Sequence, residues 1–245
     1  MKTEKFGKKL SYNNTFKRIE KKYLLTKEQK NRLINELKDN LIKDKFFATN
    51  ICNIYFDDDN SSLIVTSMEK PIFKEKVRLR SYEVPNMNSD VFLEIKTKYK
   101  SVVGKRRIKM TLKEFYDFLE NNEYDHNNQI LKELAYCFDY YNLKPSIFIG
   151  YYRESYIIKN DEYLRVTFDS KLTSRRDDLR LEKGNHGKRY FEDEELYIME
   201  IKTLGSLPLW LTSILSKNKI YPASFSKYGS IYSKEFINKE GGIEC

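Results

Sequence analysis

Cysteine and histidine are scarce in this chain of 245 residues. The three cysteines, Cys52, Cys137 and Cys245, form no CxxC pair, so the sequence does not predict a disulfide framework. A reducing compartment fits this cysteine usage best. The two histidines, His126 and His186, stand outside any metal-ligand spacing, and we expect both at the surface.

Long apolar runs are also missing. No stretch approaches the ~20 apolar residues that a membrane-spanning helix requires. The longest apolar segment, Leu207 to Leu215, is interrupted by Pro208 and Thr212. The stretch from Met1 to Phe16 contains no apolar run, so no signal peptide is predicted. These features predict a soluble, cytoplasmic protein.

Charged residues, in contrast, are abundant and unbalanced. The chain has 45 Lys and Arg against 36 Asp and Glu, which gives a formal net charge of +9. Such a balance favours phosphates, nucleic acid or an anionic membrane surface as ligands.

The sequence has no internal repeat and no low-complexity linker. We therefore expect a single domain over residues 1–245, with its core at about 16–230 and a flexible tail at 237–245.

Residue patterns predict about eight strands and a few helices, mostly without βαβ alternation. The expected strands are 16–25, 49–56, 62–67, 74–83, 91–99, 102–109, 147–159, 163–170 and 191–203, and the expected helices are 26–42, 111–121, 128–141, 207–216 and 226–236. Thr26 with Gln29, and Thr111 with Glu114, are spaced as capping boxes at the starts of two of these helices, and Ser226 is expected to cap the last one. Residues 171–188 are expected to form a mobile loop. This order predicts an antiparallel α+β protein. Eight antiparallel strands can close into a barrel that is wide enough for a small ligand.

Several of the expected strands place basic residues on one face and apolar residues on the other. In the clearest case, Lys76, Arg78 and Arg80 share a face because a strand has a period of two, and Val77 and Leu79 take the opposite face. Rows of like charge repel each other unless an anion lies among them. The pattern therefore predicts a polyanionic ligand.

The charged faces also contain carboxylates. If these faces turn inward, a barrel would enclose a basic interior with a few acidic groups, and its charged residues would be Arg18, Glu20, Lys22, Lys76, Arg78, Arg80, Glu94, Lys96, Arg153, Arg165, Asp169, Glu200 and Lys202. Arginines bind phosphates in bidentate fashion. Carboxylates in such an interior would hold Mg²⁺ or Mn²⁺, which bridges phosphate oxygens. This combination is typical of phosphoryl transfer.

An ordinary half-solvated sheet is the simpler explanation of any single alternating strand. The repetition of a glutamate followed two residues later by a lysine argues against it. This pair occurs at Glu20 and Lys22, Glu94 and Lys96, and Glu200 and Lys202.

A series of motifs, in order over about residues 16–230, resembles the VTC domain family, the polyphosphate polymerase module of the vacuolar transporter chaperone complex. The motifs are RIEKKY at 18–23, IYFD at 54–57, KVRLRSY at 76–82, FLEIK at 92–96, YRESY at 152–156, LRVTFD at 164–169, MEIK at 199–202 and FSKY at 225–228. The resemblance implies the triphosphate tunnel fold, an eight-stranded antiparallel barrel with flanking helices. It also implies a stand-alone module of bacterial type, without the regulatory domain and membrane segments of the eukaryotic proteins.

The resemblance further implies an activity and a set of site residues. ATP would donate its γ-phosphate to a polyphosphate chain, with Mn²⁺ or Mg²⁺ held by Glu200 and assisted by Glu20. The implied catalytic residues are Lys22, Arg78, Arg80, Arg153, Arg165 and Lys227. The implied phosphate-binding residues are Arg18, Lys22, Lys76, Arg78, Arg80, Lys96, Arg153, Arg165, Lys202, Ser226 and Lys227. Related hydrolases begin with ExExK, and Arg18 in place of the first glutamate favours the polymerase branch.

Two alternatives stay open at this stage. The first is a metal-dependent inorganic or nucleoside triphosphatase, with water as the acceptor. The second is a non-catalytic module that binds polyphosphate or another polyanion, although the metal carboxylate Glu200 argues against pure binding. Nucleic acid is not expected, because Lys76, Arg78 and Arg80 dominate the face on which Tyr82 lies. A membrane-protein partner is compatible with the sequence.

Overall fold

An antiparallel sheet dominates the computed structural model, which describes residues 18–100, 102–121, 123–192 and 195–240. The strand order is β1-β9-β7-β6-β2-β3-β4-β5, with β8 paired to β7. The strands are β1 (Arg18–Thr26), β2 (Leu41–Asp57), β3 (Phe73–Tyr82), β4 (Asp90–Tyr99), β5 (Val102–Thr111), β6 (Lys144–Ile158), β7 (Asp161–Arg175), β8 (Lys188–Arg189) and β9 (Leu196–Leu204). Eight of them are long, which confirms the expected antiparallel α+β architecture. The predicted start of the first strand at 16–17 lies outside the described residues.

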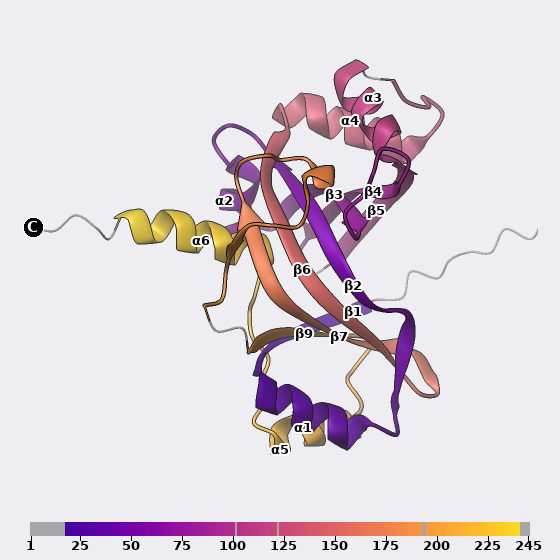
Figure 1. Cartoon of the computed structure of the whole chain (residues 1–245), viewed down its shortest axis with the longest axis vertical. Helices are drawn as coiled ribbons and strands as arrows, with labels where there is room; N and C mark the ends of the chain where they lie inside the picture. Colours follow the sequence, from indigo (N-terminus) through magenta and orange to yellow (C-terminus); the bar gives the residue numbers. More distant parts are fainter. Residues whose placement is uncertain (1–17, 101, 122, 193–194, 241–245) are drawn as a thin grey trace, which may run out of the picture.

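The sheet curls round an interior (Figure 1). Strands β1 and β5 end the hydrogen-bonded order, and no described backbone ladder joins them. Side chains nevertheless connect the two sides, because the Glu20 carboxylate on β1 lies 3.9 Å from the Lys96 ammonium on β4. The expected barrel is therefore a curled sheet whose opposite sides meet through charged side chains.

The outer face of the sheet is apolar and is covered by helices. Val77 and Leu79 of β3 are 1% exposed and belong to a core with α3 and α4, while Tyr23 and Leu25 of β1 belong to a second core with α1 and α5. Figure 1 shows these two helix pairs at opposite ends of the molecule. The helices are α1 (Lys27–Leu37), α2 (Ser62–Met68), α3 (Leu112–Asn121), α4 (Gln129–Tyr141), α5 (Leu209–Lys217) and α6 (Lys227–Glu240). None of the described helices is long and apolar enough to cross a membrane.

The segment predicted as a strand at 62–67 is helix α2, so that prediction was wrong. The Asp57 carboxylate accepts hydrogen bonds from the backbone N–H groups of Leu63 and Ile64, at 2.8 and 3.0 Å, and Asp58 accepts one from Ser62 at 2.8 Å. Carboxylates that satisfy the free N–H groups at a helix start stabilise the helix. This capping, together with burial of Ile64, outweighs the β-propensity of the segment.

Both predicted capping boxes are present. Thr26 and Gln29 exchange side-chain and backbone hydrogen bonds at the start of α1, and Thr111 and Glu114 do so before α3. The predicted end of the first helix at 42 was wrong, because α1 ends at Leu37 and β2 begins at residue 41. The apolar residues at 41–42 pair with β6 instead of continuing the helical stripe.

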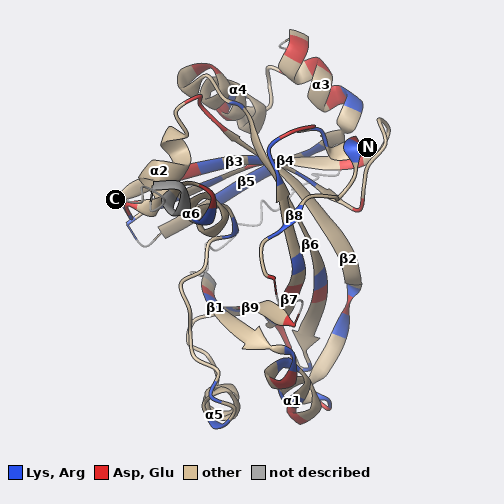
Figure 2. Cartoon of the chain, turned by 60° about the vertical axis from the view of Figure 1, so that its left-hand side comes forward, with Lys and Arg blue, Asp and Glu red and all other residues tan. Residues whose placement is uncertain are grey.

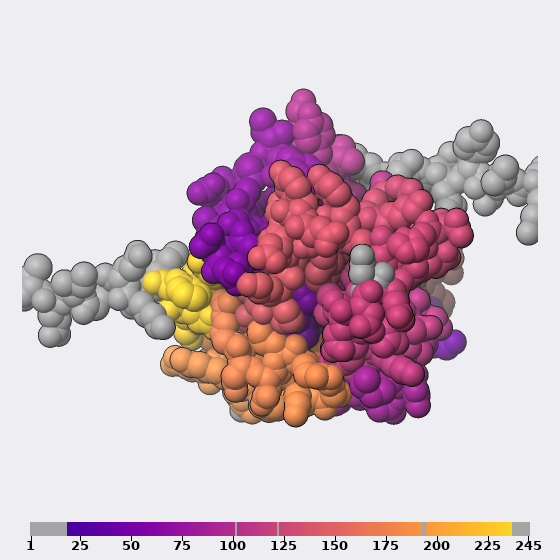
Figure 3. All heavy atoms as spheres, turned by 90° about the horizontal axis from the view of Figure 1, so that it is seen from above, coloured from indigo at the N-terminus to yellow at the C-terminus, as the bar shows by residue number. Residues whose placement is uncertain are grey.

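The predicted loop at 171–188 begins later than expected and is connected to the end of β7 by hydrogen bonds. Strand β7 continues to Arg175, whose guanidinium donates to the carbonyls of Asp178, Arg180, Gly184 and His186. A short 3₁₀ helix, Leu181–Lys183, follows and packs beside α3, where Tyr116 donates a hydrogen bond to Glu182 at 2.8 Å. Seen from above, orange atoms of this part of the chain lie against magenta ones (Figure 3).

Two predicted boundaries near the end of the chain also differ. Strand β9 begins at residue 196 rather than 191. Helix α6 continues to residue 240, so the backbone at 237–240 is helical where a flexible tail was expected. The remainder of the predicted tail, 241–245, lies outside the described residues.

Candidate functional site

The inner face of the sheet carries the predicted charged rows. Figure 2 shows basic residues gathered along β3 and β5, across the interior from β1 and β9. On β3, Arg78 and Arg80 turn to this face because their neighbours Val77 and Leu79 are buried in the outer core. The period of the strand thus creates an apolar outer face and a basic inner one.

Arg78 is held by a buried carboxylate and a tyrosine. Its Nε and Nη2 atoms lie 2.7 and 2.6 Å from Glu94 Oε2, and its Nη1 donates to Tyr55 Oη at 3.0 Å. Lys105 Nζ lies 2.6 Å from the other oxygen of Glu94. Burial opposes ionisation of Glu94, but Arg78, Arg80 and Lys105 outweigh it and lower the pKa of Glu94 to about 2. The carboxylate is therefore charged at neutral pH and keeps Arg78 in one position.

Arg80 is 7% exposed and has neutral partners. Its Nε donates to Asn53 Oδ1 at 2.9 Å, and its Nη2 donates to Tyr151 Oη at 3.1 Å. The Asn53 amide is oriented by its own hydrogen bond to the Ile149 carbonyl at 2.9 Å. Since these partners carry no full charge, the positive charge of Arg80 remains available to an anion.

A second buried carboxylate, Asp169 on β7, binds two cations. Arg153 on β6 donates to both of its oxygens, at 2.6 and 2.7 Å, and Lys227 Nζ donates to one of them at 2.6 Å. Burial opposes ionisation of Asp169, which is 1% exposed, but these two cations keep its pKa below the usual value. Lys227 is the first residue of α6, so this contact fixes the start of the helix to the sheet.

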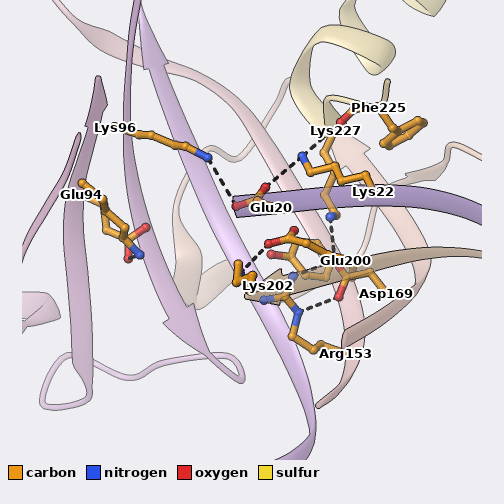
Figure 4. A network of polar contacts seen from close by, with 12 residues as sticks. Glu20, Lys22, Glu94, Lys96, Arg153, Asp169, Glu200, Lys202, Phe225 and Lys227 are labelled. Carbon is orange, nitrogen blue, oxygen red and sulfur yellow. Dashed lines mark hydrogen bonds and ion pairs between the residues drawn. The ribbon is translucent and has the colours of Figure 1, made fainter. Parts of the chain in front are cut away.

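The third charged group joins β1 and β9 (Figure 4). Glu200 Oε1 lies 2.5 Å from Lys202 Nζ, and Lys22 stands opposite Glu200 in the β1–β9 register. Glu20 lies 3.6 Å from Lys22. Burial opposes ionisation of Glu200, but Lys202, Arg153 and Lys22 hold its pKa well below the usual range.

The described residues contain no group of three acidic, histidine or cysteine side chains that could hold a metal alone. Glu20 and Glu200 are nevertheless diagonal neighbours on the inner face, because Glu20 pairs with Lys202 and Glu200 with Lys22. Mg²⁺ commonly binds through one or two carboxylates and takes its other ligands from substrate phosphates and water. This pair fits a metal of that kind.

Lys76 connects the inner face to the start of α6. Its Nζ donates to Ser226 Oγ at 3.2 Å, and the same hydroxyl accepts a hydrogen bond from the N–H of Gly229 at 3.3 Å, which caps the helix as predicted. Burial lowers the pKa of Lys76 to about 8, and the positive charges of Lys22 and other lysines contribute to the shift. An anion placed beside Lys76 would therefore stabilise the charged form of its side chain.

The structure brings most of the predicted residues together. Two are exceptions. Arg165 turns to the inner face, two residues from the buried Thr167, but its side chain is 46% exposed and its guanidinium lies 3.8 Å from Asp44. Arg18 pairs with Leu204 at the start of β1, and its side chain lies outside the described part of the structure.

Several residues of this region were assigned no role from sequence. Asn53, Tyr55 and Tyr151 orient the arginines, and nothing in a single strand indicates that they meet. Lys105 could have been found, because it lies in the alternating pattern of an expected strand. Glu94 was expected on the charged face, but its contacts with Arg78 and Lys105 depend on the β3–β4–β5 pairing.

Known proteins with similar structures share this curled sheet. A protein from Bacillus halodurans assigned as a candidate adenylate cyclase matches with a TM-score of 0.53 and 16% identity, over 90% of this chain and 98% of that one. A Hippeastrum protein described as having a dominant triphosphatase activity matches with a TM-score of 0.53 and 15% identity, over 89% of this chain and 96% of that one. At these identities the likeness shows the fold, which is the expected triphosphate tunnel fold.

Sequence comparison gives a more specific result. The chain is 27% identical over 222 residues to the vacuolar transporter chaperone complex subunit 4 of Schizosaccharomyces pombe, and the match covers 73% of this chain and 30% of that protein. The chain thus spans about a third of the length of this relative. The family model for the VTC domain matches residues 17–236. With its tunnel fold and this nearly complete match, the chain belongs to the VTC domain family.

Proposed function

We propose that the protein transfers the γ-phosphoryl group of ATP to the end of an inorganic polyphosphate chain, with Mn²⁺ or Mg²⁺ as the metal. The observation that carries the proposal is the set of pre-positioned guanidinium groups in the interior, those of Arg78, Arg80 and Arg153. Phosphoryl transfer depends mainly on positioning and charge stabilisation. Arginines that are already held in place need little reorganisation when they bind phosphate oxygens.

The transfer itself needs no covalent enzyme intermediate. An oxygen of the terminal phosphate of the acceptor attacks the γ-phosphorus, the bond to the β,γ-bridging oxygen breaks, and ADP leaves. The proposed catalytic residues orient both phosphates and neutralise the charge on them: Lys22, Arg78, Arg80, Arg153, Arg165 and Lys227. Glu200 and Glu20 would hold the divalent metal, which would supply positive charge to the substrate phosphates.

Further basic residues would extend the phosphate path. Lys76, Lys96, Lys202 and Ser226 stand on the inner face or at the start of α6, beside the proposed catalytic groups. Arg18, at the start of β1, is the remaining candidate. Its presence in place of the first glutamate of the related hydrolases supports transfer to a phosphate acceptor over transfer to water. Membership of the VTC domain family supports substrates of the ATP and polyphosphate type.

Incubation of the purified protein with ATP and Mn²⁺, followed by gel separation of the products, tests the proposal. We expect long polyphosphate and ADP. Release of inorganic phosphate without polymer would show the triphosphatase alternative, and the absence of any product would favour the polyanion-binding module.

The variant Glu200→Gln makes the test specific to the metal. It keeps the shape of the side chain and removes its charge, so we expect loss of turnover with the fold retained. Asp90→Asn is the matched control. The Asp90 side chain is 57% exposed, and its one ion pair among the described residues is with Lys109. Full activity of Glu200→Gln at saturating Mn²⁺ would refute the metal assignment.

A further inference from the structure

Three aromatic side chains and an arginine form a row across four neighbouring strands. Phe46 on β2 stacks on Tyr82 at the end of β3, with ring centroids 6.3 Å apart and an interplanar angle of 27°. Tyr82 in turn contacts Phe92 on β4 edge to face, with centroids 5.6 Å apart. The Arg107 guanidinium on β5 lies over the Phe92 ring, 4.7 Å from its centroid. We call Phe46, Tyr82, Phe92 and Arg107 the aromatic row.

Most of the row continues the face that carries the phosphate-binding arginines. Tyr82 follows Arg80 by two residues on β3, and Phe92 precedes Glu94 by two on β4. Residues two apart on a strand share a face and are separated by about 7 Å. If a ligand places its phosphates at Arg78 and Arg80, a group that lies a further ~7 Å along the strand would therefore contact the aromatic row.

The row is also accessible, although its members are large and apolar. Phe46 is 64% exposed and Tyr82 is 42% exposed, whereas Val77 and Leu79 on the outer face are covered by helices. Aromatic faces and an arginine plane are surfaces on which flat, conjugated rings stack. A polyphosphate chain contains no such ring, so binding of phosphates does not explain why these aromatic side chains are exposed.

We propose that the aromatic row binds the base of the nucleotide substrate by stacking. This inference rests on the proposed use of a nucleoside triphosphate, and it adds the site that distinguishes a nucleotide from inorganic phosphate chains. Stacking on an aromatic face tolerates different bases. ATP and GTP should therefore bind with similar affinity, and inorganic tripolyphosphate should bind without using the row.

The test compares two ligands on the same variants. Calorimetric titration with ATP and with tripolyphosphate, both in Mg²⁺ and in the absence of an acceptor, gives a Kd for each. In Phe46→Ala and Tyr82→Ala, ATP should bind roughly five- to a hundred-fold more weakly. Tripolyphosphate affinity should stay unchanged. Tyr82→Phe retains the ring and should restore ATP binding. Tyr136→Ala, which removes an exposed ring on α4, should change neither affinity.

Equal losses for ATP and tripolyphosphate, or no loss for either, would overturn the inference. Arg107→Gln is a second variant that leaves all the aromatic rings in place, and it should also weaken ATP alone. The polymerisation gel separates the two proposals. If Phe46→Ala forms polymer with an unchanged KM for ATP, base binding by the aromatic row is refuted and the proposed polymerase activity is supported. If ATP binding is lost selectively in a protein that makes no polymer, base binding by the row is supported and the polymerase activity is refuted.

Discussion

Lys76 occupies a crowded position among the charged residues of the interior. It lies beside other lysines, and burial lowers its pKa to about 8. We expect tripolyphosphate affinity to fall as the pH rises from 7 to 9, because Lys76 loses its positive charge in this range. In Lys76→Arg the charge persists, so the decrease should be smaller. Calorimetric titration at several pH values checks this, and parallel pH profiles for the two proteins would contradict it.

Asp169 compensates two buried cations at once. Asp169→Asn keeps the shape but removes the carboxylate charge that Arg153 and Lys227 contact directly, so we expect a loss of about 3–5 kcal/mol in the free energy of unfolding. Urea denaturation measures the change. Asp59→Asn is the control, because its side chain is 68% exposed and its pair with Lys144 should contribute less than about 1 kcal/mol.

An added anion provides a second check on Asp169. Tripolyphosphate should recover part of the lost stability in Asp169→Asn, since it places negative charge beside the same two cations. If the variant is as stable as the natural protein, other groups must stabilise the charges of Arg153 and Lys227.

At the scale of elements, Asp57 connects a strand to two helices. Its carboxylate caps α2 and accepts a hydrogen bond from Tyr228 Oη of α6 at 3.1 Å. Asp57→Ala should therefore lower the free energy of unfolding by about 1–3 kcal/mol through the unsatisfied buried groups. Asp59→Ala, in the same turn, should cost far less. Similar melting temperatures for the two variants would contradict the capping role.

The positions of elements were partly predictable from local pattern. The capping boxes at Thr26 and Thr111 predicted the starts of α1 and α3, because both partners of each box lie within four residues. The helix at α2 was missed, because its capping carboxylate precedes the helix by several residues and its β-branched residues are typical of a strand. The extension of β7 to Arg175 was missed for a similar reason, since the Arg175 guanidinium donates to carbonyls that follow it by nine and eleven residues.

For the whole molecule, the excess of positive charge should make stability depend on anions. Binding of tripolyphosphate to the folded protein should raise its melting temperature by mass action. Arg165→Ala should reduce this increase. It should change the melting temperature of the empty protein little, because the Arg165 side chain is 46% exposed and lies 3.8 Å from its acidic partner. Thermal denaturation with and without tripolyphosphate measures both effects.

A matched control is available at the other end of β6, which begins at Lys144 and pairs with Arg165 through Ile157. Lys144→Ala removes an exposed lysine that pairs with Asp59 and should leave the ligand-induced increase unchanged. Equal increases in Arg165→Ala and the natural protein would place the phosphates away from Arg165.

The sequence by itself determined the two faces of the sheet and the charge of the inner one. Alternation of Arg78 and Arg80 with Val77 and Leu79 is a local property of the chain, since successive side chains of any strand point in opposite directions. The order of the expected strands and helices predicted the antiparallel α+β class, and the resemblance of the motifs implied the tunnel fold.

Only the tertiary structure decided which charges meet. Arg153 could have bound Glu200 or Asp169, and the register of β6 against β7 places it opposite Asp169. Lys227 joins the same carboxylate from a helix more than fifty residues away in the chain. Register and curvature depend on the packing of both faces at once, because a slip by one residue would exchange the buried and charged rows. Short-range pattern therefore predicted the charged interior, and long-range pairing created its ion pairs and the aromatic row.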